Sequence, residues 1–443
     1  MKNKKITDDR FLMIHPRYIF LCLFSLHGLT AQAEEPAALP QPLSLQHALS
    51  LAEDEQHPAM LETSALLELS DAELQRAESK NSFRADLQLQ AAYIEPSPLA
   101  PDQSQDDLIA RLSIRKQLYD FGQSELSVAS AREEYDGFKA YRQYRVEQRR
   151  IDITRRFFEV ILSDLKYVWD NEALAIAYVR FDKLKQEHAL SRISDIVLLK
   201  AENDYEEVRY LRYNSENSQR NTRALLAETL NRPGELPSDL TTPELQYHKR
   251  EVPEYEELVN QALQQNVRLK LLEAQLEAAN KRIQAARYQA RPTLDAKLEV
   301  SDYSRESSSN DDWRAQLNLT IPLFEHQGIQ ADVAKARSTM LKQRAMLLDE
   351  QARVRQRVLE LWQNIRLLKT RREQVQLALS YRELSLDRNR ALYELEVATN
   401  LGDAMTAISE VRYQQAKTDF ELALAWMELQ LLIDNKIDTG DIQ

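Results

Sequence analysis

The sequence contains very little cysteine, glycine and proline, and each shortage excludes something. Cys22 is the single cysteine among the 443 residues, and it lies in an apolar run near the N-terminus. The remainder of the chain can therefore form no disulfide and carry out no thiol chemistry. Glycine occurs seven times, and proline is absent from residues 102–232 and from residue 323 onward. Because proline is the main interruption of helical hydrogen bonding, these two stretches predict very long helices.

The sequence signatures of common enzymes and of nucleic-acid binders are also missing. There is no G-x-S-x-G, no Walker loop and no H-E-x-x-H, and the seven histidines are scattered without metal-ligand spacing. Acid pairs such as Glu133-Glu134 and Glu256-Glu257 are typical of solvated helix faces. The formal net charge of −12 argues against nucleic acid, which requires a basic surface. The sequence thus predicts a protein that is not an enzyme and that needs no cofactor or metal.

Residues 1–33 have the layout of a secretory signal peptide. Basic residues come first, an apolar core follows over residues 18–26, and Ala31-Gln32-Ala33 forms an A-x-A cleavage site. The alternative is a membrane anchor, but the apolar run is too short to span about 30 Å of hydrocarbon. The chain is therefore predicted to be exported.

An internal repeat at a fixed offset of 205 residues organises the rest of the chain. Leu118 and Arg132 recur as Leu323 and Arg337, and several residues between them recur in the same register. A repeat of this length indicates a duplicated half-protein rather than a solenoid, whose units have 20–50 residues. We predict a first structural repeat over 34–250 and a second over 251–443. Each repeat is expected to contain a helix, two strands and a long helical hairpin.

Four segments alternate apolar and polar residues, which is the period of two expected of strands. They are residues 83–93 and 108–118 in the first repeat, and residues 294–303 and 313–323 in the second. Each has about ten residues, enough to cross a bilayer as a tilted strand. An ordinary soluble hairpin would explain any one segment, but four of them in an exported chain favour a membrane barrel. The charged residues expected to face its hydrated lumen are Arg84, Asp86, Arg111, Arg115, Lys297 and Glu299.

The remaining segments have helical periodicity. A helix is expected from Ser44 to about Lys80, bent or restarted at Pro58, and its counterpart over residues 254–289. The two hairpins are predicted to begin at about Gln123 and Gln327. A first arm of 67 residues would extend for roughly 100 Å, far longer than a globular core requires.

Four strands cannot close on themselves, and this predicts association between chains. An open sheet is not viable in a bilayer because every backbone N–H and C=O must be paired. Closed membrane barrels have at least about eight strands. Two copies of the chain are the minimum, and three would give a wider lumen.

The chain resembles the TolC-type outer membrane efflux proteins across nearly all of the expected mature sequence. The resemblance rests on short elements in a fixed order: Leu43-Ser44-Leu45, Gln117-Leu118-Tyr119-Asp120-Phe121-Gly122, Ser194-Asp195-Ile196-Val197-Leu198, Ile321-Pro322-Leu323-Phe324 and Gly402-Asp403-Ala404-Met405. It implies a mainly α fold with a small membrane β part, in which a homotrimer forms a 12-stranded β-barrel continued by a long α-helical barrel. It further implies an outer membrane channel with a periplasmic helical domain, embedded in outer membrane lipid. Such a channel conducts substrates passively in efflux or type I secretion, delivered by a periplasmic adaptor and an inner-membrane pump or ABC exporter.

The resemblance also implies a constriction at the periplasmic end of the tunnel. Asp195 and Asp403 match the acidic residues of the family's helical tips, and three copies would place six carboxylates there. The alternative is that each aspartate only favours a helix N-terminus. Ala189 and Val397 stand where the family usually has glycine, six residues before each aspartate.

Two other functions remain compatible with the sequence alone. One is a periplasmic adaptor with a long helical hairpin, although the Gly-rich β modules of adaptors are missing. The other is a soluble structural coiled coil, which would need neither a leader nor four amphipathic strands.

Overall fold

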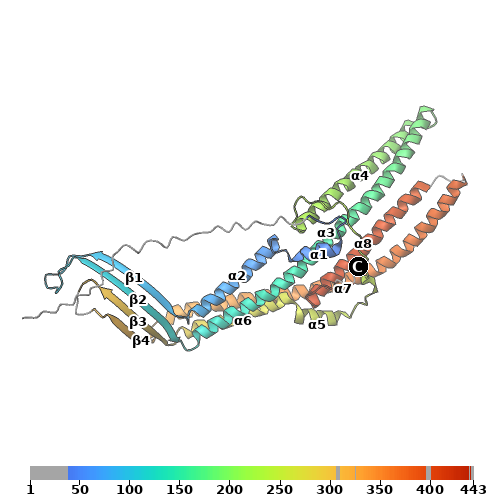
Figure 1. The fold of residues 1–443 in the computed structure, drawn as a ribbon. Coiled ribbons are helices and arrows are strands. Elements are labelled where there is room, and N and C mark those ends of the chain that lie inside the picture. Colours follow the sequence, from blue (N-terminus) through green and yellow to red (C-terminus); the bar gives the residue numbers. More distant parts are fainter. Residues whose placement is uncertain (1–37, 306–309, 325, 396–400, 439, 441–443) are drawn as a thin grey trace, which may run out of the picture. The chain divides into compact units, whose positions relative to one another are not determined.

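The structure is a computed structural model that describes residues 38–305, 310–324, 326–395, 401–438 and 440. The predicted signal peptide, residues 1–33, lies outside the described residues. The described chain is mostly helical and carries one small antiparallel sheet (Figure 1).

The same succession of elements occurs twice along the described chain. In each case a helix of 22 residues leads into two strands, a helix of nearly 70 residues and a shorter returning helix. The first set comprises α2 (Pro58–Ser79), β1 (Arg84–Tyr93), β2 (Asp106–Tyr119), α3 (Gln123–Ala189) and α4 (Asp195–Thr229). The second set comprises α6 (Val267–Tyr288), β3 (Thr293–Tyr303), β4 (Trp313–Thr320), α7 (His326–Glu394) and α8 (Leu401–Ile433). The short elements are α1 (Leu45–Ser50), η1 (Leu51–Glu53), η2 (Tyr247–Lys249) and α5 (Tyr255–Gln265).

The long helices begin and end close to where the proline-free stretches predict them. α3 has 67 residues and α7 has 69, so each extends for roughly 100 Å at 1.5 Å per residue. The returning helices end at asparagines in the left-handed conformation, Asn231 with φ 57° and Asn435 with φ 55°. Asparagine tolerates this conformation better than most residues, which explains why both helices stop there.

The sequence predicted one helix over residues 254–289, and this is wrong because the helix is divided at Asn266. Asn266 has φ −53° and ψ 120°, which is not helical, and its side chain accepts a hydrogen bond from the Leu269 N–H. It therefore caps α6 as an N-cap residue. The break has a counterpart in the first repeat, where His57 caps α2 through its bond to the Ala59 N–H. Pro58 marked that break in the sequence, whereas no proline marks the one at Asn266.

The four strands form one sheet in the order β1-β2-β3-β4, and every neighbouring pair is antiparallel. β4 ends at Thr320, three residues before the predicted end at Leu323, since Pro322 cannot donate to a ladder. An irregularity in the β2–β3 pairing between Gln117 and Tyr119 brings Tyr119 opposite Leu294. A bulge of one residue moves the side chains beyond it to the other face of the sheet.

The helical core is built mainly around the middle of α3. α3 packs against α6 and α8, and a large cluster of buried apolar side chains joins these helices to α7. Phe157 is fully buried, and Phe158 stacks on Phe420 of α8 with ring centroids 4.1 Å apart. The two sets of elements therefore share a single core.

Candidate functional site

The six charged residues expected to line a lumen lie together on one face of the sheet. Arg84 lies opposite Arg115 across β1 and β2, and Arg115 lies opposite Lys297 across β2 and β3. Residues directly opposite in an antiparallel pair point to the same side of the sheet. The same face holds Asp86, Arg111 and Glu299, and it continues on β4 with Arg314, Gln316 and Asn318.

This polar face carries a network of ion pairs that crosses the strands. Lys297 Nζ lies 2.8 Å from a Glu299 carboxylate oxygen, and Arg111 Nε lies 3.7 Å from the same carboxylate. Arg84 pairs with Asp86 at 3.1 Å along β1. The face is therefore charged, and its basic side chains outnumber its carboxylates.

The apolar face of the sheet is more exposed than the polar face. On the edge strands β1 and β4 both faces are largely exposed. On the two central strands, Ser113 is 5% exposed and the adjacent Leu112 is 43% exposed, and Ser301 is 9% exposed and the adjacent Val300 is 51% exposed. A sheet in water does the opposite, because burying apolar surface is the main favourable term in folding. The apolar face continues through Leu87, Leu112, Leu298, Val300, Trp313 and Leu319, all of which are exposed.

Exposed aromatic residues stand near both ends of this apolar face. Tyr93 and Trp313 lie near one end of the strands, and both are more than two-thirds exposed. Tyr119 and Phe324 lie at the end where the long helices begin, and Phe324 is almost fully exposed. The bulge at Gln117/Tyr119 places Tyr119 among the apolar residues. Two aromatic bands flanking an apolar band are typical of membrane strands.

β1 and β4 are the two edges of the sheet and do not pair with each other in the described part of the chain. Each edge leaves a row of backbone N–H and C=O groups without a strand partner. Such edges invite pairing with another chain.

A tight turn at Asp120 connects β2 to α3. Its carboxylate accepts hydrogen bonds from the backbone N–H groups of Gly122, at 3.2 Å, and Ser124, at 2.7 Å. Phe121 and Gly122 both have positive φ, 55° and 95°, and this pair of left-handed residues bends the chain between the strand and the helix. Arg291, which follows the end of α6, donates a hydrogen bond to the Phe121 carbonyl oxygen at 2.6 Å and so holds the turn in place. The Gln117–Gly122 element noted in the sequence thus joins the strand directly to the long helix.

Asp195 is the first residue of α4, at the tip of the first hairpin. Its carboxylate lies 2.6 Å from Nε2 of His188, near the end of α3, and its side chain is 88% exposed. The N-cap, Ser194, makes no side-chain capping bond. The left-handed residue of the loop is Ser191, with φ 56°, so Ala189 can remain the last helical residue without glycine.

Asp403 lies in the first turn of α8 and contacts the first hairpin. Its carboxylate accepts two hydrogen bonds from Nη2 of Arg180 on α3, at 2.8 and 3.1 Å. The adjacent Gly402 packs so closely on α3 that a Cβ there would lie 2.3 Å from Cδ1 of Ile176. The structure therefore places the two aspartates on separate hairpins. Val397 lies outside the described residues.

Within the described residues, no group of histidine, cysteine, aspartate and glutamate side chains is arranged to hold a metal ion. None of the described helices is both long and apolar enough to cross a membrane.

The cationic partners of the two aspartates, His188 and Arg180, were not predicted from the sequence. Sequence position could indicate His188, seven residues from Asp195, but Arg180 is separated from Asp403 by 223 residues. A row of arginines on α3 was not predicted either, namely Arg145, Arg149 and Arg156. Aligning the two repeats would have marked them, since Glu350, Val354 and Leu361 stand at the corresponding places.

Comparisons with known proteins agree on one family. Residues 258–434 match the family model described as outer membrane efflux protein. The match confirms the predicted family for this stretch of the chain, and the family is one of outer membrane channels rather than enzymes.

Several solved structures of outer membrane proteins share the fold over most of the chain. The outer membrane protein VceC of Vibrio cholerae is 16% identical, with a TM-score of 0.68 over 87% of this chain and 94% of its own. The CmeC outer membrane channel of Campylobacter jejuni is 12% identical, with a TM-score of 0.71 over 93% and 91%. The open state of the MtrE outer membrane channel of Neisseria gonorrhoeae is 16% identical, with a TM-score of 0.68 over 88% of each chain. No curated protein sequence matches the chain.

Proposed function

We propose that the protein is a passive outer membrane efflux channel whose sheet crosses the lipid and whose long helices form a periplasmic tunnel. The observation that carries this proposal is that the apolar face of the sheet is the more exposed one: on the central strand β3, Leu298 is 43% exposed, whereas the side chain of its neighbour Glu299 is 12% exposed. Lipid would cover the apolar face and water would fill the space beside the polar face. The charged residues of the polar face would then line the lumen.

The assembly we propose is a homotrimer. Each chain provides four strands and leaves the edges of β1 and β4 open, so β4 of one copy can pair with β1 of the next. Three copies would close a 12-stranded barrel, which is the assembly that the family resemblance implies. The hairpins α3–α4 and α7–α8 would continue the barrel as a ring of helices.

The helical tips would be the periplasmic entrance. Asp195 and Asp403 from three copies would supply six carboxylates to a constriction there, and crowded like charges attract cations. The Arg180–Asp403 pair ties the two hairpins of one chain together, so its rupture would accompany opening. A periplasmic adaptor and an inner-membrane pump or ABC exporter would deliver substrate, in small-molecule efflux or type I secretion.

The mass of the assembly in detergent tests this function. Protein extracted from the outer membrane fraction should have three times the mass of the chain by light scattering with detergent correction. A folded monomer in detergent, or recovery of the native protein in the soluble periplasmic fraction, would contradict the proposal. The second result would favour a periplasmic adaptor or coiled-coil protein instead.

A further inference from the structure

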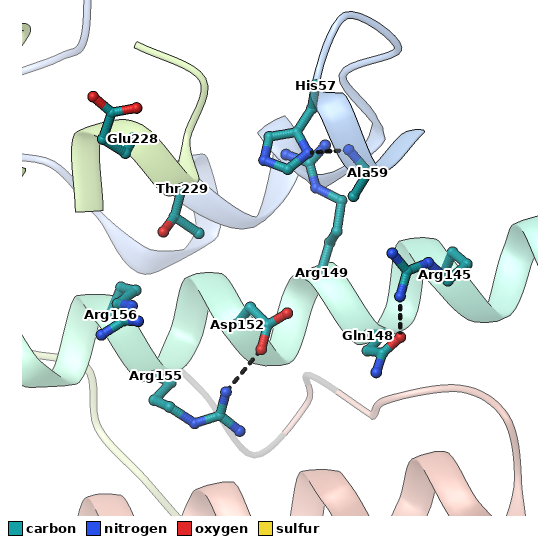
Figure 2. Close-up of a pocket in the computed structure, with 10 residues that line it drawn as sticks. All are labelled: His57, Ala59, Arg145, Gln148, Arg149, Asp152, Arg155, Arg156, Glu228 and Thr229. Carbon is teal, nitrogen blue, oxygen red and sulfur yellow. Dashed lines mark hydrogen bonds and ion pairs between the residues drawn. The ribbon is translucent and has the colours of Figure 1, made fainter. Parts of the chain in front are cut away.

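A cleft of about 450 Å³ beside the middle of α3 is lined by an unusual number of basic side chains. Arg145, Arg149 and Arg156 lie along α3, and His57 overhangs them from the start of α2 (Figure 2). Arg149 is buried and donates to the carbonyl oxygens of Asp54 and Leu51, at 3.3 and 3.4 Å.

Some arginines of this cleft are not paired with a carboxylate among the residues that the structure describes. In the described part of the chain, neither Arg145 nor Arg149 forms an ion pair, and Arg145 donates to Gln148 at 2.7 Å. Burial lowers the pKa of His57, and the charges of Arg149 and Arg145 lower it further, although Asp54 and Asp152 oppose them. Four arginines line the cleft on α3 against two carboxylates, Asp152 and Glu228, so the lining has an excess of positive charge, which suits an anionic partner.

A second cleft occupies the corresponding place in the second repeat. It is also about 450 Å³ in volume, and Glu350 and Val354 in its wall correspond to Arg145 and Arg149 at the 205-residue offset. More residues of the two cleft walls correspond when α2 is aligned with α6 and α4 is aligned with α8. Further corresponding pairs are Ala59 and Arg268, Gln148 and Arg353, Asp152 and Arg357, Arg156 and Leu361, and Glu228 and Leu432.

The two clefts differ in what lies across them. The second cleft is closed by α3, which contributes Tyr144, Gln148, Ile151, Asp152 and Arg155. This closure follows from the packing of α3 against α6 and α8. The corresponding helix, α7, makes no comparable packing with α2 or α4 among the described residues. The first cleft is therefore open at the position where, in the second repeat, a long helix of the same chain packs across the cleft.

We propose that α7 of a second copy of this chain closes the basic cleft, with Asp349 of that copy paired to Arg145. At the repeat offset, Asp349 corresponds to Tyr144, which is buried beside Glu350, the counterpart of Arg145. The assignment rests on the proposed trimer and adds the surface by which its helices join.

The α7 face carries two carboxylates that can pair with the arginines of the basic cleft. At the 205-residue offset, Tyr144 and Arg155 of the second cleft correspond to Asp349 and Glu360, whose side chains are 61% and 48% exposed on α7. Within α7, Asp349 and Glu360 pair with Arg353 and Arg357, at 2.8 and 3.0 Å, and exposed side chains exchange such contacts at little cost. Arg353 and Arg357 correspond to Gln148 and Asp152 and lie on the same face, so the face is neutral overall and only its two carboxylates would meet the arginines of the basic cleft.

Cross-linking in the intact assembly tests the contact, because the chain has no cysteine beyond residue 22. A variant with Arg145→Cys and Asp349→Cys is treated in the outer membrane with a short bifunctional thiol reagent. The monomer band on a denaturing gel should be lost to covalent dimers and trimers. The single variants should remain monomeric, and so should Arg145→Cys with Asp387→Cys, since residue 387 lies about 57 Å further along α7.

Light scattering of the same preparations separates the two proposals. A trimer that resists cross-linking at this pair would overturn the contact and leave the cleft open to solvent or a small anion, while the channel proposal would stand. A monomer would overturn both. Charge reversal gives an independent measurement: Arg145→Asp and Asp349→Arg should each lower the temperature at which the trimer dissociates, and combining them should restore it. Additive losses in the double variant would also overturn the contact.

Discussion

The substitution Leu317→Arg tests the proposed lipid face of the sheet. Leu317 lies in the middle of β4 opposite Ala296, on the apolar side of the sheet, and it is 71% exposed in the single chain. If lipid covers it, arginine there would cost about 2–4 kcal/mol near the bilayer midplane. The folded-to-unfolded ratio of each chain would then fall roughly 30- to 700-fold. If water covers it, Leu317→Arg would change stability by only a few tenths of a kcal/mol.

Refolding from urea into lipid vesicles, followed by gel mobility without heating, measures this difference. Asn318→Arg is the matched control, since Asn318 is the next residue on β4 and lies on the polar face opposite Asp295. A new arginine there would meet an opposite charge across the strands and should leave the urea midpoint unchanged or slightly raised. Equal losses for the two variants would refute the assignment of the faces.

Three further changes test the helical region. Replacing Asp195 and Asp403 together by asparagine should reduce cation preference in planar-bilayer conductance; unchanged selectivity would mean that the aspartates do not ring the constriction. Gly402→Leu should destabilise the contact between the hairpins by about 1–3 kcal/mol because no space exists beside Ile176, and Ile176→Ala should recover part of the loss in thermal unfolding. Because the folded-state pKa of His57 is lowered, the unfolded chain binds the proton more tightly, so stability should fall as pH drops below about 6.5. His57→Asn, which can still cap α2, should flatten that dependence in unfolding measured between pH 7.5 and 5.5.

The strands and the long helices could be predicted because their patterns are local. Residues 83–93 and 294–303 alternate apolar and polar residues over most of their length, and the structure places strands within one or two residues of those bounds. The absence of proline likewise indicated the long helices α3 and α7, because no residue in these stretches interrupts the helical hydrogen bonds. Local periodicity also identified the polar face, because the side-chain period of two decides the face once the register is fixed.

The parts that could not be predicted depend on contacts distant in sequence. The break at Asn266 is stabilised by Asn435, whose side chain accepts from the Val267 N–H at 2.8 Å. Nothing in the helical pattern of residues 254–289 signals that contact. Arg180 meets Asp403 only because α3 and α8 lie side by side. The family resemblance implied a glycine at the position of Ala189, but the left-handed conformation falls on Ser191, two residues further along the chain. Ala189 can therefore remain helical.

The proposed channel requires lipid on the apolar face of the sheet and water on the polar face. Thiol labelling of Leu317→Cys and Gln316→Cys in proteoliposomes tests this requirement most directly, because the two positions are adjacent on β4 and point to opposite faces. With a membrane-impermeant maleimide, the Gln316→Cys thiol should react and the Leu317→Cys thiol should be protected until detergent and urea expose it. Rapid labelling of Leu317→Cys in intact membranes would contradict the account.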